Sequence, residues 1–199
     1  MPKKYLLVIL LWFLSTAAHS QDENSFHGIF DTYFHHNPLD KPFSEFLLGI
    51  KNDPGIAITE FTKRSDKRLF TLSGIFSGNV PELRAVVPDS VEIFLTEVPV
   101  LLSDSLKLFD TIFIYQVVFS ASSEKESENN FIWEYKKFIR KYKGLFNSVI
   151  HRKPQSKGLG NGEAAEFMDE SSPLPSLTVF WGTVPVEKKL FFTVSLYIK

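Results

Sequence analysis

Three residues near the start of the chain have types and spacing that can support metal binding. His27, Asp31 and His35 follow one another at intervals of four residues. On a helix this spacing places two imidazoles and a carboxylate on one face, and these groups are ligands of Zn²⁺ and similar divalent metals. A solvated polar face opposite a Phe-rich stripe explains the same pattern. We therefore assign no metal site and keep the three residues as candidates only.

A second group of residues can contact anions. Arg152, Lys153 and Lys157 lie in the basic, Gly-rich stretch RKPQSKGLGNG, residues 152–162. Lys and Arg side chains in a surface loop attract anionic lipid head groups and acidic polymers. A loop that is merely solvated is the alternative interpretation. These three residues are the predicted contacts with an anionic surface.

The motifs of several enzyme classes are absent. The chain has no cysteine and no G-x-S-x-G or S-x-x-K sequence. It therefore lacks a cysteine nucleophile, a thiolate metal site and a recognisable serine acyl-transfer motif. We expect a protein that is not an enzyme and needs no cofactor. The 22 basic and 23 acidic residues also lack the basic excess typical of nucleic-acid binders, so no nucleic-acid partner is expected.

Three helices that must position these residues are indicated by hydrophobic periodicity. The first is predicted over 25–36 and ends at Asn37-Pro38. The second follows Asp40, a candidate N-cap, and ends at the turn Asn52-Asp53-Pro54-Gly55. The third covers 131–142 and ends near Gly144, which leads the chain toward the basic stretch.

Most of the remaining chain is predicted as strands. The expected strands are residues 56–62, 68–76, 91–98, 112–119, 145–150, 177–184 and 190–198, whereas 163–168 is predicted as one or two helical turns. This order predicts an α+β fold with helices packed on an antiparallel sheet, arranged as two tandem α-β-β-β units. The predicted divisions are 1–20 (signal peptide), 21–39 (short helix), 40–121 (first unit) and 122–199 (second unit).

The first twenty residues have the layout of a secretory signal peptide. Lys3 and Lys4 precede an apolar run over 5–14, and Ala18 and Ser20 favour cleavage before Gln21. The apolar run is too short to cross a bilayer comfortably, and no later stretch can do so. Because the chain also lacks cysteine and N-x-S/T acceptors, we expect export in a bacterium, to the periplasm or outside the cell.

One segment resembles a known family. Residues 43–76 combine a helix, the turn NDPG, a strand, the charged turn TKRSDKR and a strand that ends in LSGIF. This resembles the BON-type module of bacterial envelope proteins, in particular the copies N-terminal to peptidoglycan-binding domains of the outer-membrane-protein-A type. The resemblance covers about 34 residues and implies envelope maintenance and phospholipid contact. It implies no catalytic residue, and the anchoring domain of those proteins is not present in this sequence.

These observations predict an exported, non-enzymatic module of the cell envelope that binds an envelope protein, lipid or polymer. A carrier of a lipid or another small apolar ligand is the alternative, because the 20 Phe residues can line a pocket. A hydrolase with dispersed acidic residues is a further alternative. The outward face of residues 190–199 leaves room for a homodimer.

Overall fold

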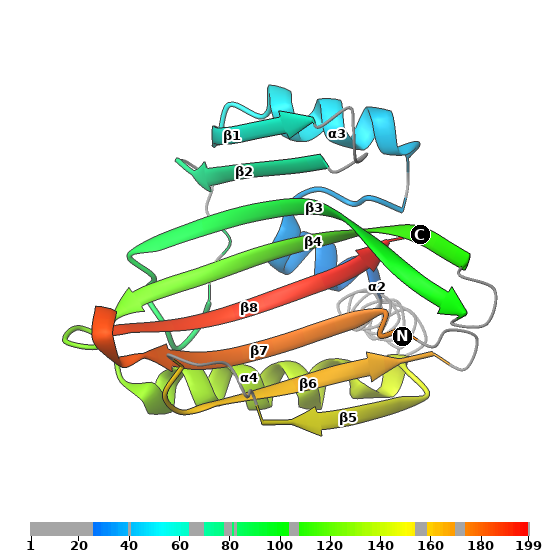
Figure 1. Cartoon of the computed structure of the whole chain (residues 1–199). Helices are drawn as coiled ribbons and strands as arrows, with labels where there is room; N and C mark the ends of the chain where they lie inside the picture. Colours follow the sequence, from blue (N-terminus) through cyan, green and yellow to red (C-terminus); the bar gives the residue numbers. More distant parts are fainter. Residues whose placement is uncertain are drawn as a thin grey trace, which may run out of the picture.

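A single antiparallel sheet of eight strands dominates the structure (Figure 1). The computed structural model describes residues 26–39, 41–63, 70–77, 81, 83–103, 108–153, 159–169 and 174–198. The strand order is β1-β2-β3-β4-β8-β7-β6-β5. The strands are β1 (Ile56–Lys63), β2 (Phe70–Phe76), β3 (Ser90–Ser103), β4 (Leu108–Ser122), β5 (Ser148–Arg152), β6 (Gly162–Met168), β7 (Leu177–Val184) and β8 (Lys189–Ile198).

Short helical segments connect and cover these strands. They are α2 (Phe26–Ile29), the π-helix η1 (Phe30–Phe34), α3 (Phe43–Asn52), α4 (Glu128–Tyr142) and the 3₁₀ turns η2 (Lys143–Leu145) and η3 (Pro185–Glu187). Figure 1 shows α2 and α4 behind the sheet, and α4 packs against β7 and β8. No helix in the described part of the chain is long and apolar enough to cross a membrane.

The two halves of the chain meet in the middle of the sheet. In each half one helix, α3 or α4, precedes four strands that pair in sequence order. The fourth strands then pair with each other, from Phe113↔Ile198 to Ser122↔Lys189. Because β4 and β8 lie side by side, the halves share one sheet instead of forming separate layers.

The predicted α+β class, with two tandem α-β-β-β units, is therefore wrong. The described chain is mostly one antiparallel sheet with few helices, and each half contributes four strands to it. The prediction lacked one strand of the second half, β6, because the sequence analysis assigned its residues to helical turns. Its residues GEAAEFM include strong helix formers, but pairing with β5 on one side and β7 on the other overrides that local preference.

The N-terminal helix also differs from its prediction. Instead of one α-helix over 25–36, the described chain has a single α-turn followed by the π-helix η1. The His35 N–H donates to the Phe30 carbonyl at 2.9 Å, and His35 itself takes a left-handed conformation with φ 59°. The chain therefore leaves the helix at His35, which breaks the regular spacing assumed for the candidate metal ligands.

The second and third helices and the turn after the second are confirmed. The α3 helix ends at Asn52, and the Asp53 carboxylate accepts the Gly55 N–H at 2.7 Å in the predicted NDPG turn. The helix begins after Pro42, without a side-chain cap, and Asp40 lies outside the described residues. The predicted signal peptide, residues 1–20, and the turn residues 64–69 also lie outside them.

The core lies between the sheet and the helices behind it. Along β2, β3, β4 and β8 alternate side chains are buried, such as Leu95, Val117 and Val194. Aromatic rings fill the space under α4: Phe138 lies with its ring centroid 5.2 Å from that of Tyr33 and 5.7 Å from that of Phe167. Such tilted and edge-on ring contacts contribute packing energy beyond the area they bury. The opposite face of the sheet is half-exposed.

Candidate functional site

Charge is distributed unevenly along the chain. Residues 135–162 contain eight Lys and Arg residues and no Asp or Glu. The rest of the chain then holds 14 basic and 23 acidic residues, although the whole chain has a net charge of only −1. This segment comprises the last two turns of α4, the strand β5 and the loop that follows. A strongly charged region of one sign attracts partners of the opposite sign.

The α4 helix presents part of this charge on its outer face. Its buried side chains, Phe131, Tyr135, Phe138 and Tyr142, pack toward the sheet. The residues between them point away and are exposed: Trp133, Lys136, Arg140 and Lys143. Their spacings of three, four and three residues place them in one stripe along the helix. The amphipathic pattern that buries the aromatic side chains therefore also aligns three cations on the outside.

Two basic residues of the segment are neutralised within the protein. Lys137 Nζ lies 3.1 Å from Glu134 Oε2, a carboxylate that is fully buried. Arg152 Nε lies 2.7 Å from Glu166 Oε2 across β5 and β6. Among the described residues, Lys136, Arg140, Lys143 and Lys153 have no such acidic partner. Lys141 has no acidic partner there either, but it is half-buried, with its Nζ 5.1 Å from the Tyr142 ring centroid, so these four are the exposed cations available to a ligand.

Exposed apolar side chains lie on the same elements as these cations. Trp133 is 43% exposed on α4, with Lys137 Nζ 5.1 Å from its ring centroid. Leu145 follows the helix at 38% exposure. An exposed tryptophan among Lys and Arg is typical of surfaces that contact the head-group region of a bilayer. We call Trp133, Lys136, Arg140, Lys143 and Lys153 the basic surface.

A polar cluster fixes β5 beneath α4. The Tyr135 hydroxyl lies 3.3 Å from His151 Nδ1, and the same nitrogen lies 3.2 Å from Glu163 Oε1. Burial raises the pKa of Tyr135, and the nearby Glu163 carboxylate raises it further, so the phenol stays protonated. These contacts join α4, β5 and β6. They hold Lys153, next to β5, at a defined position relative to the helix.

The predicted anion contacts fall at the margin of the basic surface. Arg152 is engaged with Glu166, Lys153 is exposed, and Lys157 lies outside the described residues. Sequence analysis missed Trp133, Lys136, Arg140 and Lys143, because 131–142 was examined only for its apolar stripe. The sequence does contain a signal for these cations: residues 135–162 carry basic residues and no acidic ones. That signal appears only when the helix and the loop after it are considered together.

The candidate metal ligands do not form a recognisable site in the described residues. Asp31 is exposed, and the His35 ring lies edge-on to Phe76, with centroids 5.5 Å apart. Burial lowers the pKa of His35. The side chain of His27 lies outside what the structure describes. Among the described residues, no group of three His, Asp or Glu side chains is placed to hold a metal ion.

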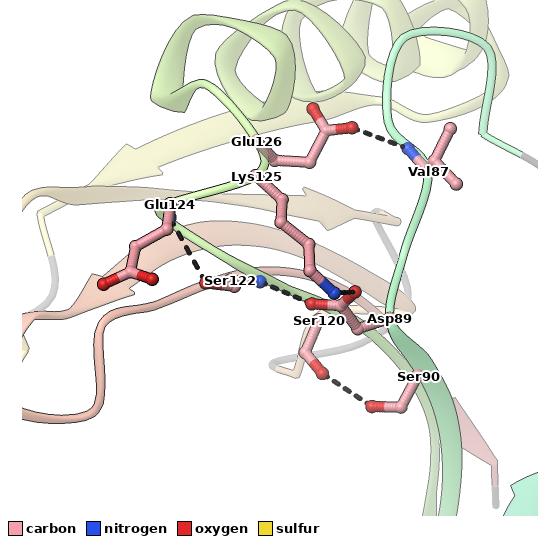
Figure 2. A network of polar contacts seen from close by, with 8 residues as sticks. All are labelled: Val87, Asp89, Ser90, Ser120, Ser122, Glu124, Lys125 and Glu126. Carbon is pink, nitrogen blue, oxygen red and sulfur yellow. Dashed lines mark hydrogen bonds and ion pairs between the residues drawn. The ribbon is translucent and has the colours of Figure 1, made fainter.

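Acidic side chains gather at the other end of α4, where they fasten a neighbouring segment (Figure 2). Asp89 accepts hydrogen bonds from the Ser122 N–H and from Lys125 Nζ, both at 2.8 Å, and Glu126 accepts the Val87 N–H at 3.2 Å. The hydrogen bond from Lys125 lowers the pKa of Asp89. An open depression of about 370 Å³ nearby is lined by Glu126, Glu128 and Lys188 among others. This end therefore lacks the unpaired cations of the basic surface.

Comparison of the chain with protein-family models, with curated proteins and with solved structures found no match. The BON-type resemblance of residues 43–76 thus stays a prediction. Functional inference consequently depends on the geometry of the chain itself.

Proposed function

We propose that this chain is an exported, non-enzymatic module of a bacterial cell envelope that binds an anionic envelope component through the basic surface. The observation that carries the proposal is the exposed stripe of Trp133, Lys136, Arg140 and Lys143 along α4 and η2, with the exposed Lys153 after β5; these four cations have no acidic partner among the described residues. Export is proposed on the signal-peptide layout of residues 1–20, and the BON-type resemblance agrees with an envelope location.

An anionic phospholipid surface is the partner that best fits this chemistry. A Lys or Arg near such a surface contributes about 1 kcal/mol, so four unpaired cations contribute about 4 kcal/mol at low ionic strength. That free energy corresponds to about a thousandfold in affinity. Trp133 and Leu145 add apolar contact that a purely polar anionic polymer would not use. The lipid surface therefore accounts for both kinds of exposed side chain.

No observation among the described residues favours the carrier alternative. The described Phe residues pack against other aromatic rings: Phe138 has its ring centroid 4.8 Å from that of Tyr142 and 6.3 Å from that of Phe192. A Phe-lined pocket for a ligand would need such rings to face an open volume. Ring-to-ring packing among the described residues instead supports a binding surface on the outside of the protein.

Vesicle sedimentation tests the proposal. The mature chain, residues 21–199, is mixed with vesicles of phosphatidylglycerol and phosphatidylcholine, and bound protein is measured against vesicles of phosphatidylcholine alone. The variant K136S/R140S/K143S removes three cations that have no acidic partner among the described residues, so its fold should be intact. We expect about 100-fold weaker binding to the anionic vesicles at low ionic strength.

The matched control removes the same charge elsewhere. In K41S/K51S/K189S the net charge changes equally, but all three lysines are exposed and lie away from the basic surface. We expect this control to bind nearly as well as the wild type. Equal weakening of both variants would mean that only net charge matters. Binding to a soluble acidic polymer with no binding to vesicles would replace the lipid by a polymer as the partner.

A further inference from the structure

The face of the sheet opposite the helices carries few charges. On the four central strands its described positions alternate with the core residues and include Phe94, Ile114, Val118, Phe180, Phe191 and Tyr197, all half-buried. Two of the polar side chains between them are paired with neighbours on the same face: Gln116 Nε2 donates to Ser195 Oγ at 2.9 Å, and Thr178 Oγ1 donates to the Tyr197 hydroxyl at 3.4 Å. Glu92 and Lys189 are the charged residues at the described positions of these strands on this face. We call this surface the open face.

Small side chains in the middle of the open face are covered by their neighbours. Thr193 and Ser195 on β8 are only 8% and 5% exposed, although they point away from the core. Gly182 on β7 is covered by neighbouring rings, since a Cβ there would lie 2.8 Å from Phe180 Cζ and 3.1 Å from Phe191 Cζ. The two rings have centroids 5.1 Å apart. Larger side chains thus fill the spaces above the small ones.

No helix lies over this face in the described part of the chain, as Figure 1 shows from the open side. Strands lie about 4.8 Å apart and rise about 3.4 Å per residue, so eight residues of each of the four central strands cover about 500 Å² together. Eight residues of each of the eight strands cover about 1,000 Å² by the same spacings. The outer strands add Glu60, Arg152 and Glu166 to this face, and Arg152 and Glu166 are paired with each other. A stable interface needs about 800 Å² from each partner, so the sheet is large enough to supply one.

We propose that the open face is the interface of a homodimer, in which two copies pack sheet against sheet. Two copies carry the same right-handed twist, and sheets of equal twist pack aligned at about −30° with side chains interdigitating about 10 Å apart. The scarcity of charge avoids burying unpaired ions, and aromatic side chains with few charges are typical of interface cores. A two-fold axis would leave the basic surface of each copy, behind its sheet, on the outside of the dimer.

Sedimentation equilibrium of the mature chain, residues 21–199, tests this proposal without any vesicle or ligand. We expect a dimer mass at about 50 µM protein, a concentration well above a micromolar dissociation constant. In V118R a long cation stands in the centre of the open face, and we expect the dissociation constant to rise about 100-fold. L48R places the same side chain at a 57% exposed position on α3 and should leave the dimer unchanged.

Cysteine crosslinking provides a second measurement if V118R does not fold. Because the chain contains no cysteine, single substitutions at Phe94, Val118, Phe180 and Thr193 introduce unique thiols on the open face. We expect at least one of these four variants to form a covalent dimer on mild oxidation, whereas L48C should not. A monomer mass for the wild type, a dimer that V118R does not weaken, or crosslinking through L48C alone would each overturn the proposal. None of these outcomes depends on vesicle binding.

Discussion

Glu134 is the residue whose substitution should affect stability and binding in opposite directions. Its side chain is fully buried on α4, where it accepts the Ala85 N–H at 2.6 Å and lies 3.1 Å from Lys137 Nζ. The first contact fastens the segment before β3 to the helix. The second neutralises a cation next to the basic surface. One carboxylate therefore stabilises the fold and withholds Lys137 from a ligand.

The magnitudes follow from these two contacts. E134Q keeps an acceptor for Ala85 but replaces two charge-assisted hydrogen bonds by neutral ones, which should cost about 2 kcal/mol. E134L leaves the Ala85 N–H without its partner and Lys137 without its counter-charge, which should cost about 4 kcal/mol. For a chain of this length, 1 kcal/mol corresponds to about 2–4 °C in melting temperature. E134Q should thus melt about 4–8 °C lower than the wild type.

Urea denaturation followed by circular dichroism gives the stability, and vesicle sedimentation gives the binding. E134Q releases Lys137, so we expect tighter binding to phosphatidylglycerol vesicles, by up to about fivefold for a gain of about 1 kcal/mol. E134L should be less stable than E134Q. A wild-type free energy of unfolding for E134Q, or weaker binding to anionic vesicles by a folded E134Q, would refute this assignment of Glu134.

Three further predictions concern single side chains. Burial lowers the pKa of His35 from its ordinary 6.5, so the unfolded chain binds more protons than the folded chain near that pH. The stability of the protein should therefore fall as the pH drops below about 6.5. The variant H35N, whose side chain also suits the positive φ at this position, should reduce that pH dependence in thermal melts. G182A should lower the free energy of unfolding by about 1–2 kcal/mol, since its methyl group displaces the rings of Phe180 and Phe191, and an unchanged urea midpoint would contradict that contact. W181F should be nearly neutral, within about 1 kcal/mol, because the buried Nε1 has no hydrogen-bond partner in the described chain and its loss offsets the lost packing; a larger drop in the urea midpoint would show that the indole N–H is satisfied.

Local patterns in the sequence predicted most elements but not their assembly. The apolar stripe of α4 and the NDPG turn after α3 depend on neighbouring residues, so their sequence is sufficient. The strand β6 was missed because its Ala, Glu and Met residues favour a helix, and only the flanking strands β5 and β7 make it extended. Pairing of β4 with β8 joins residues more than 60 positions apart, such as Phe119 and Phe192, and no local pattern indicates it.

Only part of the candidate site was predicted, again because the rest depends on tertiary contacts that local sequence patterns do not show. Arg152 and Lys153 stand in an obviously basic stretch, whereas Lys136, Arg140 and Lys143 are separated by the apolar residues of an amphipathic helix. Their alignment requires the helix, and their availability requires the ion pairs that remove Lys137 and Arg152. Which cations are unpaired depends on Glu134 and Glu166, whose partners follow from tertiary contacts.

Tryptophan fluorescence tests the role of the basic surface most directly, because Trp133 lies within it. The chain has three tryptophans, so the variant W12F/W181F retains Trp133 alone. We predict that vesicles containing phosphatidylglycerol shift its emission to the blue and protect it from acrylamide, that phosphatidylcholine vesicles do neither, and that high salt reverses the change. Unchanged Trp133 emission under conditions where the protein sediments with anionic vesicles would place the contact on another surface and contradict the proposed function of this one.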